Sequence, residues 1–460
     1  MSTDSTLPVR TVRGIRYAVA ERFAPPVAVP YSPGDELGTS GPMCPQLAGM
    51  LEKMLGADVS NSSEDCLFLD VFAPEGAAPG SLPVLVWVHG GAYLNGSGSA
   101  AWYDGSRLAS RGTVVVSINY RLGAFGYLGT RNLGLLDQIT ALEWVQRHVT
   151  AFGGDPGNVT IFGESAGGSA VVSLLAAPAT KGLVHRAWSM SPSIRQLRGT
   201  ESARRWEAEF LAAAGVGSVE EARALSVEDV LAAQAKVLAL GGVEYDMFAP
   251  TGGGDGLPDD ILAAAAANPV PWCVGTNRDE NLLFLAFDPN FARATVEQWE
   301  KHLARAFGDR AAEARAAYEA ARPGESPLNL ISAVQTDHGF RRPAQKLAEA
   351  RVATGNPSWM YWFTWASPAF DGLLGSAHAL DIPFAFDNLD APGSGLMLGD
   401  AGLDGARNLA TRFADEIVGF ARTGVASWPR FDVDRRPTLR LDVQTELLHD
   451  PEPALRALHD

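Results

Sequence analysis

The chain has 460 residues, of which 46% are hydrophobic and 20% are charged, a balance that is ordinary for a globular protein. Its formal net charge of −16 argues against nucleic acid as a partner, because binding phosphates requires a basic face. The acidity favours solubility, with steering of cationic substrates as the alternative. No apolar run approaches the roughly 18–20 residues of a membrane span, so we expect no membrane partner.

The N-terminal residues lack the basic region and apolar core of a secretory signal. We therefore expect a cytoplasmic protein, with secretion after removal of a leader as the alternative. The cysteines Cys44, Cys66 and Cys273 show no metal-binding spacing, and no metal is expected. A disulfide between Cys44 and Cys66 would close a short loop, although a reducing cytoplasm opposes one.

Nearly continuous apolar runs predict buried strands in the first part of the chain. Residues 9–17 alternate in polarity and predict an entry strand, with Gly14 as a turn or bulge. A helical stripe of apolar side chains runs through residues 137–149. Four runs are apolar on both faces: residues 66–72, 83–89, 113–119 and 158–162. Such runs are typical of strands that are covered on both sides of a sheet. This alternation predicts a mostly parallel α/β sheet flanked by helices.

The second part of the chain mixes strands with long helical segments. Helical spacing without strand signals marks residues 200–240 and 292–322. Further strands are predicted at residues 185–190, 271–275, 359–365 and 437–441. We expect a single domain over residues 1–460, with helical insertions at about 195–250 and 285–357 that roof the active site.

The motif Gly163-Glu164-Ser165-Ala166-Gly167 lies between an apolar strand and a helical run, the context in which G-x-S-x-G indicates a nucleophile. A serine at this sharp turn is held above the sheet edge, and the flanking glycines let strand and helix approach closely. Ser165 is therefore the candidate nucleophile, and the backbone N–H of Ala166 can face a developing oxyanion. The alternative is a chance glycine-serine turn.

A serine nucleophile needs a base and an orienting carboxylate, in the chain order serine, acid, histidine on this kind of sheet. His378, in a loop of small residues after an aromatic-rich strand, is the candidate base. His338 is its rival, with a helix-capping or surface position as the alternative for that residue. The candidate acids Asp279 and Glu280 are neighbours after a strand, and spacing alone does not choose between them.

The turn Gly90-Gly91-Ala92 ends a buried strand upstream of the nucleophile. Glycines let backbone N–H groups approach a ligand, so this turn and Ala166 form the candidate oxyanion hole. An ordinary glycine turn is the alternative. Glu164, beside the nucleophile, either tunes His378 electrostatically or serves as a structural hydrogen-bond partner.

Four segments carry a family resemblance. Residues 152–168 resemble the nucleophile signature of the type-B carboxylesterases, a family that includes bacterial para-nitrobenzyl esterases, animal carboxylesterases and cholinesterases. Residues 64–74 resemble its second signature, and residues 119–126 and 132–138 also match. The resemblance extends from about residue 11 to residue 441.

The resemblance implies an α/β-hydrolase fold and resolves the choice of acid. Glu280 matches the acid of the family motif G-x-N-x-D-E-G, and His378 falls on the family histidine. Cys44 and Cys66 fall on a family disulfide. The family's oxyanion donors fall on Gly91, Ala92 and Ala166, with Gly90 adjoining.

Departures from the family pattern lie along the substrate path. Asn281 replaces the glycine after the acid, and Ser191-Pro192-Ser193 replaces a common Glu-Ser-Gly. The loop between Gly126 and Asn132 is short, and the chain is shorter than usual through residues 285–357. The resemblance therefore implies the chemistry but leaves the substrate open.

The expected function is hydrolysis of small carboxylic esters through a Ser165–Glu280–His378 triad and an acyl-enzyme, without a cofactor, by a monomer or weak homodimer. One alternative is hydrolysis of amides, carbamates or a specialised natural-product ester. A non-catalytic cholinesterase-like binding protein is disfavoured because all three triad residues are present. A choline-like cationic substrate would need an aromatic site, to which Trp102 or Trp365 could contribute, although such residues are more often core.

Overall fold

The computed structural model describes residues 7–47, 49, 60–241, 246–286, 288, 290, 293–399 and 403–460. The strands of its central sheet are β1 (Val9–Arg16), β4 (Phe68–Pro74), β5 (Leu82–Val88), β6 (Val114–Ile118), β7 (Gly154–Glu164), β8 (Arg186–Met190), β9 (Trp272–Asn277), β10 (Ser358–Phe363), β11 (Pro437–Leu441) and β12 (Glu446–His449). A separate small ribbon pairs β2 (Ala18–Val19) with β3 (Val27–Ala28).

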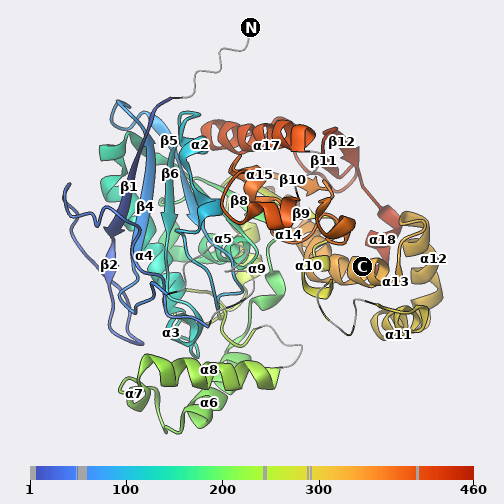
Figure 1. Cartoon of the computed structure of the whole chain (residues 1–460), viewed down its shortest axis with the longest axis horizontal. Coiled ribbons are helices and arrows are strands. Elements are labelled where there is room, and N and C mark those ends of the chain that lie inside the picture. Colours follow the sequence, from blue (N-terminus) through green and yellow to red (C-terminus); the bar gives the residue numbers. More distant parts are fainter. Residues whose placement is uncertain are drawn as a thin grey trace.

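The ten strands lie in the order β1-β4-β6-β5-β7-β8-β9-β10-β11-β12 (Figure 1). Neighbours from β6 through β11 run parallel, and antiparallel pairing is found at the two ends of the sheet. The mostly parallel α/β sheet predicted from the sequence is therefore confirmed. The register between β1 and β4 shifts between Val12 and Ile15, which confirms the bulge expected at Gly14.

Helices cover both faces of this sheet. One layer contains α4 (Leu133–His148), α5 (Ala166–Ala176), α9 (Ile261–Ala267) and α14 (Arg342–Ala353). The opposite layer contains α2 (Ser106–Ala109), α15 (Ile382–Ala385) and α17 (Leu403–Thr423). Because side chains alternate along a strand, Val84, Val86 and Val88 of β5 enter the first core while Leu85 and Trp87 enter the second. This explains why the central strands are apolar throughout.

The remaining helices lie outside the two layers. Below the sheet in Figure 1, α6 (Thr200–Ala214), α7 (Val219–Ala222) and α8 (Val227–Gly241) form a group beside α3 (Gly123–Tyr127). A second group, with its own hydrophobic cluster, contains α10 (Leu282–Leu285), α11 (Val296–Phe307), α12 (Ala311–Ala321), α13 (Pro327–Thr336) and α18 (Pro453–Leu458). The short α16 (Ser394–Leu398) precedes α17.

A π-helical turn at Asp337–Arg341 joins α13 to α14. α14 packs on β9 and β10, so the segment 285–357 contributes to the sheet covering as well as to the second helical group. None of the described helices is both long and apolar enough to cross a bilayer. That 195–250 and 285–357 together roof the active site stays a prediction.

Several boundaries differ from the sequence prediction. β7 begins at Gly154 rather than residue 158, because Gly154 pairs with Leu82 ahead of a register shift, although Pro156 and Gly157 read as a turn. β12 pairs with the outer edge of β11, although the sequence analysis predicted β11 as the last strand. The six-residue α18 was not predicted, since so short a helix shows no clear period.

Candidate active site

Ser165 stands at a strained turn between β7 and α5. Its backbone has φ 59° and ψ −121°, a conformation in which glycine is the usual residue. A Cβ on Gly167 would lie 2.0 Å from the carbonyl oxygen of Val88, and one on Gly163 would lie 2.6 Å from the backbone of Gly167. The two motif glycines are therefore required by the close approach of β5, β7 and α5, and the predicted geometry of the turn is confirmed.

Glu280 and His378 meet although they lie almost one hundred residues apart. Glu280 follows β9 and His378 follows β10, and parallel neighbours bring these loops to the same sheet edge. The imidazole Nδ1 of His378 is 2.6 Å from Oε2 of Glu280. The other oxygen of Glu280 accepts the backbone N–H of Asn277 at 2.7 Å, which fixes the carboxylate. Both side chains are buried.

The other acid and the other histidine of the sequence analysis lie elsewhere. The carboxylate of Asp279 accepts a hydrogen bond from the backbone N–H of Ser376 at 3.0 Å and forms an ion pair with Arg322. It therefore does not face His378. The ring of His338 lies on the π-helical turn, with its centroid 6.2 Å from that of His459. Of the alternatives that spacing left open, Glu280 and His378 are the pair that the fold brings together.

The second imidazole nitrogen of His378 faces Glu164. Nε2 lies 3.1 Å from Oε1 of Glu164. Among the described residues, the side-chain partner of Ser165 Oγ is the hydroxyl of Ser193 at 3.3 Å rather than His378. The Ser193 N–H also donates to the Ser165 carbonyl at 3.2 Å. Sequence reasoning noted Ser193 as a departure along the substrate path but not as a neighbour of Ser165.

Three carboxyl groups surround the buried imidazole. Burial lowers the pKa of His378, but Glu164 and Glu280 more than offset this and raise the pKa to about 9. Burial raises the pKa of Glu164 to about 8, even though His378 opposes the rise. Burial and the charge of Glu280 raise the pKa of Asp381 to about 7. The protonation of this site is therefore shared among coupled groups.

The glycine-rich turn after β5 lies against Ser165. A Cβ on Gly90 would lie 3.1 Å from Cβ of Ser165 and 2.7 Å from the Glu164 carbonyl oxygen. Gly91 and Ala92 have φ of 105° and 57°, so this turn uses a left-handed backbone. Candidate oxyanion donors from two segments are thus held next to Ser165.

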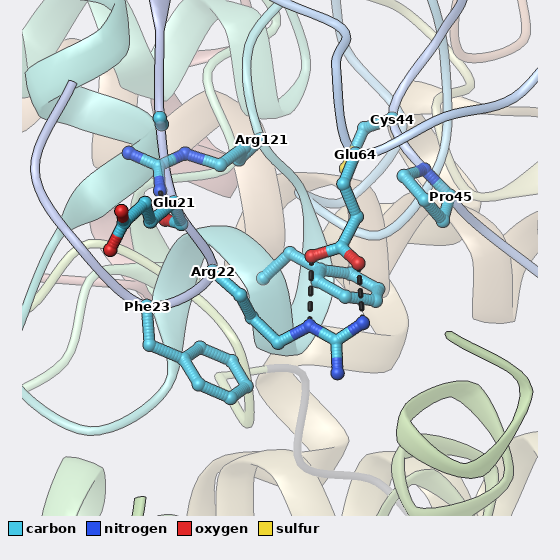
Figure 2. Close-up of a pocket in the computed structure, with 9 residues that line it drawn as sticks. Glu21, Arg22, Phe23, Cys44, Pro45, Glu64 and Arg121 are labelled. Atoms are coloured by element: carbon cyan, nitrogen blue, oxygen red, sulfur yellow. Dashed lines mark hydrogen bonds and ion pairs between the residues drawn. The ribbon is translucent and has the colours of Figure 1, made fainter. Parts of the chain in front are cut away.

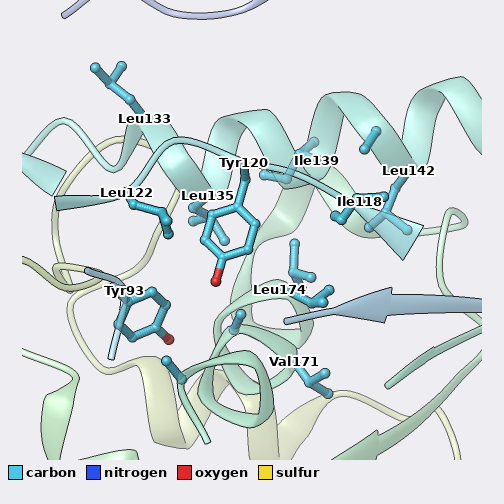
Figure 3. Close-up of a cluster of buried hydrophobic side chains, with 14 of the residues drawn as sticks. Tyr93, Ile118, Tyr120, Leu122, Leu133, Leu135, Ile139, Leu142, Val171 and Leu174 are labelled. Carbon is cyan, nitrogen blue, oxygen red and sulfur yellow. The ribbon is translucent and has the colours of Figure 1, made fainter. Parts of the chain in front are cut away.

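His89 supports this turn, a role that sequence reasoning missed. Its Nδ1 is 2.8 Å from the Gly90 carbonyl, and its ring stacks on Tyr120 with centroids 4.5 Å apart. Burial lowers the pKa of His89 to about 4, so the ring is neutral. Figure 3 shows Tyr93 and Tyr120 within the hydrophobic cluster that also contains Val171 and Leu174 of α5.

Two aromatic side chains line the imidazole. The ring centroids of Phe284 and Phe340 lie 5.4 and 4.8 Å from that of His378. Phe284 is 47% exposed, so an apolar surface reaches from solvent to the imidazole of His378. Trp102 and Trp365 are instead buried in the core beneath α15 and α17, where they cannot form an open choline-like site.

The disulfide implied by the resemblance is not present. Cys44 and Cys66 are free, buried thiols. Cys44 Sγ accepts the backbone N–H of Leu122 at 3.2 Å, and a hydrogen bond with Cys44 together with burial raises the pKa of Cys66. Figure 2 shows Cys44 at a small pocket beside the ion pair of Arg22 and Glu64. Contact between the thiols thus replaces the expected bond.

Comparison with known proteins decides the family. The model of the carboxylesterase family matches residues 1–452. The chain belongs to the carboxylesterase family. It is 38% identical to the para-nitrobenzyl esterase of Bacillus subtilis (strain 168) over 439 residues, which cover 90% of this chain and 86% of that relative. This confirms the family resemblance seen in the sequence motifs.

Other relatives and solved structures agree. A probable N-octanoylanthranilate hydrolase of Rhodococcus erythropolis is 35% identical to this chain, and the match covers 92% of this chain and 91% of that relative. A solved structure titled as a thermophilic PNB esterase superposes with a TM-score of 0.83 at 33% identity, covering 100% of this carboxylesterase and 97% of the solved chain. The protein is therefore a carboxylesterase with an α/β-hydrolase fold, a serine hydrolase of carboxylic esters.

Proposed function

We propose that Ser165, His378 and Glu280 form the catalytic triad of this carboxylesterase. Ser165 Oγ attacks the ester carbonyl while His378 Nε2 takes its proton. The protonated His378 then gives that proton to the leaving alcohol, and an acyl-enzyme remains on Ser165. Water, deprotonated by His378, attacks the acyl carbon and releases the acid with restoration of the Ser165 hydroxyl. Glu280 orients the imidazole through Nδ1 and stabilises the imidazolium.

The observation that carries this proposal is the buried 2.6 Å contact between His378 Nδ1 and Glu280 Oε2, at the sheet edge where the strained Ser165 turn lies. The hydroxyl of Ser165 points to Ser193 in this structure, so it rotates toward Nε2 before attack. Catalytic hydrogen bonds are often long or misaligned without substrate and shorten in the reactive complex.

The oxyanion is held by the backbone N–H groups of Gly91, Ala92 and Ala166, with Gly90 as the adjoining residue. The left-handed backbone of Gly91 and Ala92 and the closeness of Gly90 to Ser165, which leaves little room for a side chain, support this assignment. Losing one such donor typically costs about 3 kcal/mol of transition-state stabilisation. Glu164 contacts Nε2 and tunes the basicity of His378.

The substrate is a small ester whose apolar part lies on Phe284 and Phe340. A second candidate activity is amide hydrolysis, favoured by the similarity to a probable N-octanoylanthranilate hydrolase. Carbamates and specialised natural-product esters are further candidates that share the acyl-enzyme chemistry. The cytoplasmic location and the monomeric or weakly dimeric state stay predictions.

The test compares the wild type with Ser165→Ala on para-nitrophenyl esters from acetate to octanoate, with matched anilides in parallel. We expect turnover of the esters by the wild type and loss of nearly all activity in the variant, since the nucleophile is removed. Faster turnover of anilides than of esters would favour the amidase candidate.

Labelling by a fluorophosphonate separates the remaining outcomes. If the folded wild type hydrolyses none of the esters but is labelled at Ser165, the nucleophile is correct and the proposed substrate class is wrong. A folded wild type that is neither active nor labelled would contradict the triad and favour a non-catalytic binding protein.

A further inference from the structure

The acid that does not face His378 connects the two loops that carry the catalytic couple. We call residues 277–281 the acid loop and residues 375–381 the histidine loop. The side chain of Asp279 accepts the backbone N–H of Ser376 at 3.0 Å, and the backbone N–H of Asp279 donates to the Ser376 carbonyl at 3.0 Å. This reciprocal pair lies one residue from Glu280 and two from His378.

Asp279 is held in turn by a buried arginine from the helical insertion. Arg322, just past the end of α12, donates from Nη1 to Oδ1 of Asp279 and from Nη2 to the Arg278 carbonyl at 3.1 Å. The Arg322 side chain is 1% exposed and that of Asp279 is 11% exposed. A guanidinium can make both contacts at once because its donors are fixed in a plane.

The charges around Arg322 explain how it stays ionised inside the protein. Burial lowers the pKa of Arg322, but Asp279, Glu452 and Asp337 offset this, so the net effect raises the pKa. Glu452 and Asp337 also interact with Arg341, and Asp337 accepts the hydroxyl of Tyr318 at 2.8 Å. Arg322 is therefore anchored in a buried polar cluster outside the proposed catalytic site.

We propose that Asp279 and Arg322 are positioning residues, which clamp the acid loop to the histidine loop and so set the contact between Glu280 and His378. The inference rests on the proposed triad. It adds a second role for the Asp-Glu pair: Glu280 orients the imidazole, and its neighbour Asp279 fixes the distance between the two loops. Asn277 supplies a parallel link, since its Nδ2 donates to the Ala377 carbonyl at 2.7 Å.

The test uses Asp279→Asn, Arg322→Met, their double variant and the conservative Arg322→Lys in the full chain. A displaced Glu280 supports the imidazolium poorly in the transition state, so we expect kcat for para-nitrophenyl acetate to fall about tenfold or more. KM should stay within about twofold, because substrate binding is not touched. Arg322→Lys, which keeps the charge, should retain part of the activity, and the double variant should fall little below the worse single variant.

A readout independent of turnover is the NMR titration of the His378 imidazole, assigned with His378→Gln. Glu164, Glu280 and Asp381 all face this ring and raise its pKa. Loosening the clamp should lower the pKa of His378 because the contribution of Glu280 weakens. The titration reports on the clamp even if the wild type hydrolyses no ester. Failure of the proposed triad would appear as absent activity, whereas failure of the proposed clamp would appear as an unchanged pKa of His378 in the variants.

The matched control is Arg121→Lys, which weakens another buried arginine–aspartate pair, Arg121–Asp137 at 2.7 Å, away from both loops. It should lower Tm while leaving kcat and the His378 titration as in the wild type. If Asp279→Asn and Arg322→Met behave like this control, the pair is only structural and the proposal is overturned.

Discussion

Glu164 places a second carboxylate against His378, next to Nε2 rather than Nδ1. A triad histidine must be neutral to take the serine proton, and a nearby negative charge favours its protonated form. With the pKa of His378 raised to about 9 in the resting enzyme, the neutral base becomes abundant only as the pH rises above neutrality. The wild-type kcat/KM should therefore increase into the alkaline range.

Replacing Glu164 by glutamine should move the acid limb of the kcat/KM profile to lower pH by about 1 unit. The substitution removes a charge that raises the pKa of His378, so the neutral imidazole persists to lower pH. The measurement is kcat/KM against pH for para-nitrophenyl acetate, with Glu143→Gln on the exposed face of α4 as the control. An unmoved acid limb would mean that Glu164 is a structural hydrogen-bond partner, the other role considered from the sequence.

At the scale of elements, the Ser165 turn depends on how closely β5, β7 and α5 approach. The sequence predicted this turn because a G-x-S-x-G pattern between strand and helix has few other uses. It could not show that Ser193, in the loop after β8, would lie at Ser165. Nor could it show that Phe340, on the π-helical turn, would reach His378. Both contacts depend on the three-dimensional path of connecting segments, which leaves no periodic signal in the sequence.

Gly167→Ala tests the packing of that turn. The new Cβ would lie 2.0 Å from the Val88 carbonyl, so backbone must move, and we expect a loss of about 3 kcal/mol in the free energy of unfolding. Gly419→Ala, inside α17 with no atom near the added Cβ, should instead gain up to about 1 kcal/mol because alanine favours helix. Urea denaturation measures both, and equal effects would contradict the packing argument.

At the scale of the whole molecule, the sheet and its two helical layers followed from apolar runs and their spacing. The acid was chosen by family resemblance, because Asp279 and Glu280 are adjacent and only the three-dimensional path of the acid loop separates them. The disulfide was the inference that did not hold in the structure. Loop closure by Cys44 and Cys66 is compatible with the sequence, yet the sulfur atoms meet as hydrogen-bonded thiols.

Thiol counting checks this state. The chain has three cysteines, and all three are buried and free. We expect three reactive thiols per chain after unfolding without reductant. In the native protein the reaction should be slow, because the hydrogen bond with Cys44 and burial raise the pKa of Cys66, and burial raises the pKa of Cys273. A count of one thiol after unfolding would instead establish a bond between Cys44 and Cys66.

The left-handed backbone at Ser165 sets stability and reactivity against each other at one position. Glycine would adopt this conformation without the roughly 1–3 kcal/mol of strain that a side chain introduces there. Random mutation that is filtered only for a more stable fold would therefore tend to replace the proposed nucleophile by glycine, which under the proposed mechanism erases the activity. Under the proposed mechanism, a serine persists at residue 165 only while hydrolysis itself is under selection.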